Sequence, residues 1–147
     1  METVLIGFLA GAFSGAFMGL ISHTCFRLGL FKSSLIVIDG SFFFRTLNVQ
    51  SSPSLSLGTG FVIHLVTSGI FGALYVAATG YFGFSTLSFP LMSVYVLLLW
   101  LSMLFIALPV AGEGMYGKKS GHFAWLEQFI LHVIFLVLYF VVLKKLL

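Results

Sequence analysis

Histidines are the residues of this sequence whose chemistry is best suited to binding a cofactor or relaying a proton. There are four, and two of them, His64 and His132, fall inside long apolar stretches. Ionisable residues within membrane-spanning segments are costly and point to function by default. Because haem b is held by two imidazoles from facing helices, we consider His64 and His132 as ligands of haem b or another tetrapyrrole.

A short internal repeat relates these two histidines. The segment FVIHLV at 61–66 matches FILHVI at 129–134 in residue type at every position. Two hairpins related by an axis along the membrane normal would make the two positions equivalent. The competing interpretation, which we favour, is that each histidine hydrogen-bonds a carbonyl or hydroxyl of a neighbouring helix, since buried polar residues often hold membrane helices together.

The other titratable groups are expected on the same side of the membrane as the histidines. This predicted polar cluster comprises His23, Asp39, Glu113, His122 and Glu127. It raises a second hypothesis, a pathway for a small molecule or a proton. The predicted spans hold few other polar residues, which is unlike a typical transporter. No Ser/His/Asp set, HExxH motif or phosphate-binding glycine loop is present, so the sequence favours a protein without enzymatic activity.

The composition sets the class of protein to which these residues belong. Of 147 residues, 60% are hydrophobic and only 7% are charged, whereas a soluble domain has about 25% charged residues. A soluble globular enzyme, a disordered tail and a nucleic-acid-binding protein are therefore excluded, and an integral membrane protein is predicted. The single cysteine, Cys25, allows neither an intramolecular disulfide nor a CxxC metal site.

Four stretches are long and apolar enough to cross a bilayer as helices. They cover about residues 3–22, 59–82, 87–110 and 123–142, which predicts an all-α four-helix bundle and a single domain over 1–147. Between the first two spans, apolar residues 35–38 and 42–44 flank Asp39 and Gly40. This run is too short to span, so it predicts an interfacial or re-entrant segment, followed by a flexible connector at 48–57.

Glycines predict how the first two spans pack. They recur every fourth residue in the first span and also occur in the second, and small residues at this spacing let two helices approach closely in lipid. We expect this packing within one chain rather than in a homodimer, although a homo-oligomer and a flat cofactor beside the glycines are alternatives. The residues concerned are Gly7, Gly11, Gly15, Gly19, Gly69 and Gly72.

The basic residues predict the orientation of the spans. Five lie in the loops on one side and two, Lys144 and Lys145, lie at the C-terminus on the other. Under the positive-inside rule, this predicts cytoplasmic loops and outward termini in a bacterial inner membrane. The five loop residues are Arg27, Lys32, Arg45, Lys118 and Lys119.

Several motifs in residues 58–142 resemble a family of small, uncharacterised four-helix bacterial membrane proteins. They are FVIH at 61–64 followed by Gly69-x-x-Gly72-x-x-Tyr75, a third span with Trp100 that ends in Pro109-x-x-Gly112-x-Gly114, and His132 with Tyr139. The chain departs from the family after its last histidine, where Phe135, Leu136 and Leu138 replace glycines. The resemblance implies a fold and no particular activity.

Taken together, these patterns favour a non-catalytic accessory subunit of a larger membrane complex. The predicted bundle has almost no mass outside the membrane, no receptor domain and few interior polar groups. Its aromatic faces would contact lipid and other membrane-protein subunits. An electron-transfer complex, respiratory or photosynthetic, is our candidate, with tetrapyrrole binding through His64 and His132 and small-molecule or proton transport as the alternatives.

Overall fold

The computed structural model describes all 147 residues and is built from helices alone. Four helical segments are long and apolar enough to cross a membrane, so the chain is an all-α integral membrane protein, as predicted. The elements in chain order are α1 (Glu2–Arg27), α2 (Leu35–Thr46), α3 (Pro53–Tyr81), α4 (Phe89–Ser102), a π-helical turn (Met103–Ala107), α5 (Leu108–Ala111), a 3₁₀ turn (Met115–Gly117) and α6 (Ala124–Leu146).

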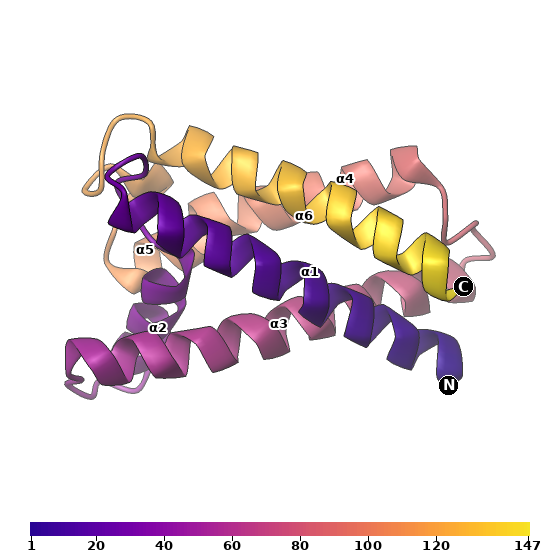
Figure 1. Cartoon of the computed structure of the whole chain (residues 1–147), viewed down its shortest axis with the longest axis horizontal. Coiled ribbons are helices and arrows are strands. Elements are labelled where there is room, and N and C mark those ends of the chain that lie inside the picture. The colour runs from indigo at the N-terminus through magenta and orange to yellow at the C-terminus, as the bar shows by residue number, and fades with distance from the viewer.

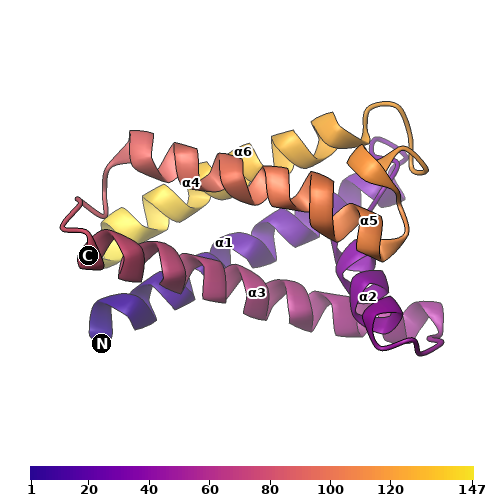
Figure 2. The same ribbon diagram turned by 180° about the vertical axis from the view of Figure 1, so that it is seen from behind.

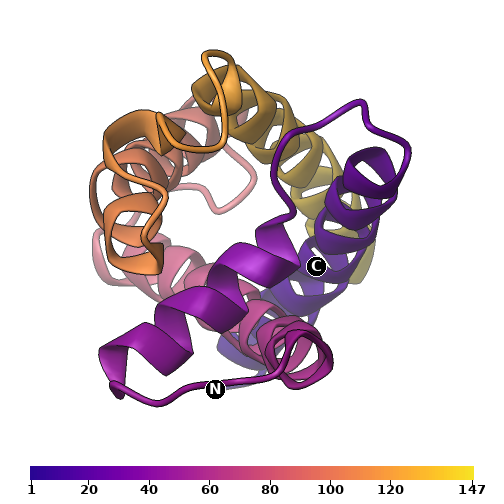
Figure 3. The ribbon, with the colours of Figure 1, turned by 90° about the vertical axis from the view of Figure 1, so that its left-hand side faces the viewer.

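The four spans surround a common axis in the order α3, α1, α6 and α4 (Figure 1). Both termini lie at one end of the bundle, and α2 crosses the opposite end obliquely (Figure 3). Although α3 and α4 are consecutive, their backbones are not in close contact (Figure 2). A side-chain bridge joins them instead, because the Tyr95 hydroxyl donates to the Phe71 carbonyl at 2.8 Å. The α3–α4 side is therefore the loosely closed side of the bundle.

Helices α1 and α3 pack most closely, through the glycines that the sequence singles out. A Cβ at Gly11 would lie 3.0 Å from the Cα of Gly72, and a Cβ at Gly7 would lie 2.8 Å from the Gly72 carbonyl oxygen. The space beside Gly69 is filled by the ring of Phe8, 2.6 Å from where a Cβ would stand. These glycines thus serve contacts within the chain, and a flat cofactor has no room beside Gly69.

Helix α2 is the segment that the sequence predicts as interfacial or re-entrant. Its 12 residues span only about 18 Å at 1.5 Å per residue, so it cannot cross a bilayer. It is not a freely lying surface helix, because Leu35, Ile36 and Ile38 are buried. It packs across α3, where a Cβ at Gly60 would lie 2.8 Å from the backbone nitrogen of Gly40. Residues of α2 therefore contribute to the interior of the bundle.

The predicted connector at 48–57 is wrong for its last five residues, because α3 begins at Pro53. Proline is tolerated in the first helical turn, because the backbone N–H groups there have no acceptor within the helix and the lack of one costs nothing. The Ser52 side chain accepts a hydrogen bond from the Leu55 N–H at 3.3 Å and caps the helix. The run of serines and Pro53 thus marks a helix start rather than a flexible linker.

The third span is interrupted by the π-helical turn Met103–Ala107. Pro109 follows closely and cannot donate to the carbonyl of Phe105 four residues earlier, which disfavours regular α-helix at this point. The span then ends at Gly112, whose φ of 92° is the left-handed conformation that glycine adopts at helix ends. The hydropathy pattern predicts the span but carries no signal for this turn.

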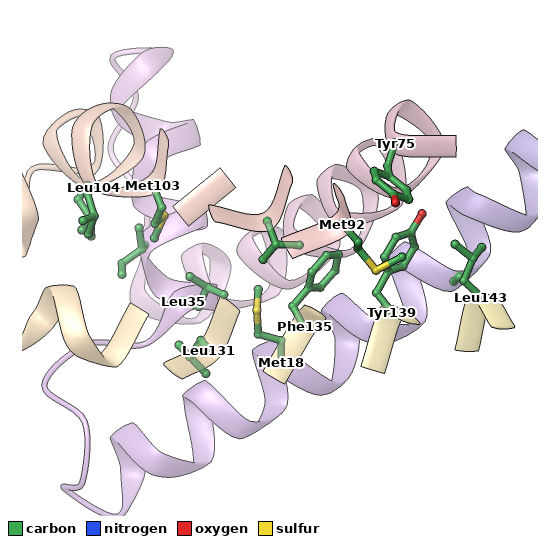
Figure 4. Packing of buried hydrophobic residues seen from close by; sticks show 14 of the residues in the cluster. Met18, Leu35, Tyr75, Met92, Met103, Leu104, Leu131, Phe135, Tyr139 and Leu143 are labelled. Atoms are coloured by element: carbon green, nitrogen blue, oxygen red, sulfur yellow. The ribbon is translucent and has the colours of Figure 1, made fainter. Parts of the chain in front are cut away.

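Buried apolar side chains run along the length of the bundle, from Leu104 and Met103 near the α2 end to Tyr139 and Leu143 toward the α3–α4 hairpin (Figure 4). The rings of Phe135 and Tyr139 stack with centroids 5.5 Å apart. The Tyr139 hydroxyl donates to the Gly72 carbonyl at 2.8 Å and so joins α6 to α3. Most of the buried polar residues lie in the other half of the bundle, toward α2, with Thr79 beside the hairpin as an exception.

Candidate functional site

His64 joins three helices through its ring. Its Nδ1 lies 2.7 Å from Oδ2 of Asp39 on α2, and its Nε2 lies 3.0 Å from the Gly15 carbonyl oxygen on α1. Because the Gly15 carbonyl only accepts, Nε2 of His64 carries a hydrogen, and a second hydrogen lies between Nδ1 and Asp39. Whether this hydrogen is on the ring or on the carboxyl group, the pair as a whole has no net charge. Pairing of this kind is what makes burial of two ionisable groups tolerable.

The contacts of His64 bear on the tetrapyrrole hypothesis. Iron binds an imidazole through a nitrogen lone pair, and both ring nitrogens of His64 are already hydrogen-bonded. Ligation by His64 would therefore break its bond to Asp39 or to Gly15. For this reason we do not propose tetrapyrrole binding.

His132, the other predicted ligand, has a different environment. Its Nδ1 lies 2.7 Å from the Gln128 carbonyl oxygen one turn earlier on α6. A carbonyl oxygen only accepts, so Nδ1 carries a hydrogen, and Nε2 of the neutral ring presents a lone pair. The side chain is 8% exposed, and no group of the protein hydrogen-bonds its Nε2. His132 thus holds an acceptor without a partner in the interior.

Both histidines line one cavity of about 400 Å³ in the bundle, which we call the central cavity. All four spans and α2 contribute to its wall, and ten of its 16 lining residues are hydrophobic. The six polar side chains on this wall are Asp39, His64, Thr67, Ser68, Ser102 and His132. A largely apolar cavity of this size with a few convergent polar groups is typical of a small-molecule site.

The π-helical turn of the third span forms part of this wall. Met103, Ile106 and Ala107 all line the central cavity, and Ser102 immediately precedes the turn. Single π turns within α-helices are frequent at functional sites. Sequence reasoning did not assign the turn to a site, although Pro109 was a signal of irregular backbone nearby.

The other predicted polar residues do not form one cluster. Glu127 accepts the backbone N–H of Lys32 at 3.0 and 3.1 Å through its two oxygens, and the Ser33 hydroxyl at 3.4 Å. It therefore fastens the α1–α2 connection to the start of α6. This is a structural role, because the carboxylate satisfies a backbone N–H of the α1–α2 connection that has no backbone partner.

The remaining three residues of the predicted polar cluster lie apart from the central cavity. His23 hydrogen-bonds Ser34 through Nδ1 at 3.0 Å, Glu113 accepts from the Ser120 hydroxyl, and the His122 side chain makes no hydrogen bond. No group of three His, Cys, Asp or Glu side chains in the chain could hold a metal ion. Of the predicted cluster, only Asp39 belongs to the candidate site.

Comparison with known proteins gives no relative: no family model, no curated protein and no solved structure matches this chain. The central cavity is therefore the feature of this chain from which a function can be inferred.

We expect the Asp39–His64 contact to be energetically coupled. Asp39→Ala and His64→Ala should each lower the free energy of unfolding by about 3–5 kcal/mol, because each leaves a buried polar partner unpaired. The double variant should lose clearly less than the sum of the two. Unfolding in mixed detergent micelles followed by circular dichroism measures all four proteins. As a control, Asp39→Ala combined with Ser93→Ala should be additive, because the Ser93 hydroxyl bonds only the Phe89 carbonyl of its own helix, α4. Additivity for Asp39 and His64 would contradict the coupling.

Proposed function

We propose that this protein binds a small molecule dissolved in the membrane, holds it in the central cavity and does no chemistry on it. The observation that carries the proposal is Nε2 of His132, a residue of the cavity wall, because this nitrogen has no hydrogen-bond partner in the protein. Polar groups inside a membrane protein need partners, so an unpaired nitrogen at a cavity of ligand size is explained when a ligand completes its hydrogen bond.

The loosely closed α3–α4 side supports access from the hydrocarbon core. Phe71 of α3 and Ile106 of the π turn line the central cavity and are 38% and 58% exposed. Both belong to membrane-spanning segments, so a molecule that enters past either of them would come from lipid rather than from water. This favours a ligand that partitions into the bilayer.

Filling the cavity should abolish binding. Ala107 lines the cavity, so an indole in Ala107→Trp would occupy the ligand's space and weaken binding of a naphthalene-sized probe by about tenfold or more. Isothermal titration in detergent, with protein-free micelles as reference, measures the affinity. Ala77→Trp is the matched control, because Ala77 is exposed on α3 and does not line the cavity. Absence of saturable binding, or equal binding by both variants, would refute the proposal.

We further propose that the protein lies in a bacterial inner membrane with the α2 end of the bundle in the cytoplasm. The fold brings both basic loops to this end (Figure 1), so their charges act together in the sense of the positive-inside rule. The resemblance to small bacterial four-helix proteins favours the same membrane.

A cysteine-labelling experiment tests this orientation. In a Cys25→Ser background, Lys118→Cys should react with a membrane-impermeant maleimide only after the cells are broken, because the loop faces the cytoplasm. A cysteine at Glu2 should be labelled in intact cells and serves as the opposite control. Labelling of position 118 from outside intact cells would reverse the assignment.

An accessory role in a larger membrane complex, with an electron-transfer complex as the candidate, is our second proposal. Helix α4 has only two buried residues, Met92 and Val96, among its 14, so most of its apolar surface is free to contact lipid or a partner helix. Blue-native electrophoresis of native membranes should then show the chain in a large complex. Migration only as a monomer or small homo-oligomer would exclude this role and leave ligand binding untouched.

A further inference from the structure

The hydrogen-bonding state of the central cavity points to the chemical class of its ligand. Building on the proposed binding function, we infer that the ligand is a neutral, membrane-soluble molecule with an apolar body and a hydroxyl head, a phenol or an alcohol, that donates a hydrogen bond to His132 Nε2. The inference depends on which polar atoms of the wall are free and which are already engaged.

Most protons on the wall are already used within the protein. The Thr67 hydroxyl donates to the Ile63 carbonyl at 2.8 Å, and the Ser102 hydroxyl donates to the Leu99 carbonyl at 2.7 Å. Both ring nitrogens of His64 are engaged by Asp39 and Gly15. These side chains therefore have no hydrogen left to offer a ligand.

The atoms that stay free are mainly acceptors. His132 presents the Nε2 lone pair because its hydrogen lies on Nδ1, and Asp39 uses Oδ2 for His64 while Oδ1 has no partner in the protein. The Ser68 hydroxyl, 5% exposed, makes no hydrogen bond and is the one free group that can donate as well as accept. A ligand with a donor can pair with His132 Nε2 or Asp39 Oδ1, whereas a ligand with only ether or carbonyl oxygens could accept from Ser68 alone and would leave both acceptors unpaired.

The charges on the cavity wall further restrict the chemical class of the ligand. No lysine or arginine lines the central cavity, so a carboxylate or phosphate would have no cation to pair with. Asp39 is already paired with His64, so a cationic ligand would have to compete with an existing internal partner. Charges buried without a partner are strongly unfavourable, and a neutral head follows.

The apolar part of the wall accounts for the body of the ligand. Ten hydrophobic side chains line the cavity. Two of them, Phe71 and Ile106, are also exposed. A hydroxyl head near His132 can therefore be combined with an apolar body that extends toward the α3–α4 side. The complementary molecule has one donor and little other polarity.

Two probes that differ in a single donor test this inference on the complete protein. 1-Naphthol has the hydroxyl, and 1-methoxynaphthalene has nearly the same shape but no donor. We expect the wild type to bind 1-naphthol about tenfold or more tightly than the ether, because a site with unpaired acceptors discriminates strongly against a ligand that cannot donate. His132→Phe keeps a ring at this position and should remove most of that preference, because it takes away the acceptor that the hydroxyl of 1-naphthol would use. Expressing each affinity as a ratio of wild type to variant cancels the partitioning of each probe into micelles.

The outcomes separate this inference from the proposed binding function. Equal affinity for the two probes, with both blocked by Ala107→Trp, would overturn the hydroxyl ligand and leave a binding cavity. Binding of neither probe would overturn both. If His132→Phe does not fold, the two probes are compared on the wild type, with each affinity referred to the measured concentration of that probe in the micelles. A preference for 1-naphthol that survives in a folded His132→Phe would show that His132 is not the acceptor.

Discussion

The contact between Asp39 and His64 is the interaction on which the α2 end of this structure depends. A bilayer provides no water to buried polar groups, so each must find a partner inside the protein. Asp39 lies on a helix too short to cross the membrane, and its 2.7 Å contact with His64 ties that helix to α3. The second nitrogen of His64 reaches Gly15 and adds α1. One imidazole thus joins three helices through two hydrogen bonds.

The close approach of α1 and α3 makes this contact geometrically accessible. Gly19 leaves room for the imidazole, since a Cβ there would stand 2.9 Å from its Cδ2. The close packing is confined to the α1–α3 side of the bundle. On the α3–α4 side, the two helices are bridged only through side chains such as Tyr95. The π turn interrupts the third span where that span lines the central cavity. The central cavity is the result of dense packing on one side and irregular backbone on the other.

The sequence predicts the parts of this fold that depend on local pattern. Hydropathy locates all four spans, and the glycine spacing in the first span marks the face that lies on α3. The partners of Asp39 could not be predicted, because the position of α2 across the bundle depends on tertiary packing. His64 and His132 do line the same cavity, yet the repeat that relates them hides a difference: the first is fully paired and the second has a free lone pair. That difference comes from neighbours distant in sequence for His64, and from the backbone of Gln128 for His132.

The central claim is that His132 presents an unpaired acceptor to an apolar cavity. Nitrogen-15 NMR of histidine-labelled protein in lipid bilayers tests it most directly, with His132→Phe used to assign the signals. The account predicts a neutral His132 ring with its hydrogen on Nδ1 and a bare Nε2, whose resonance shifts when 1-naphthol is added but not when 1-methoxynaphthalene is added. A hydrogen on Nε2, or an Nε2 resonance that neither probe perturbs, would contradict it.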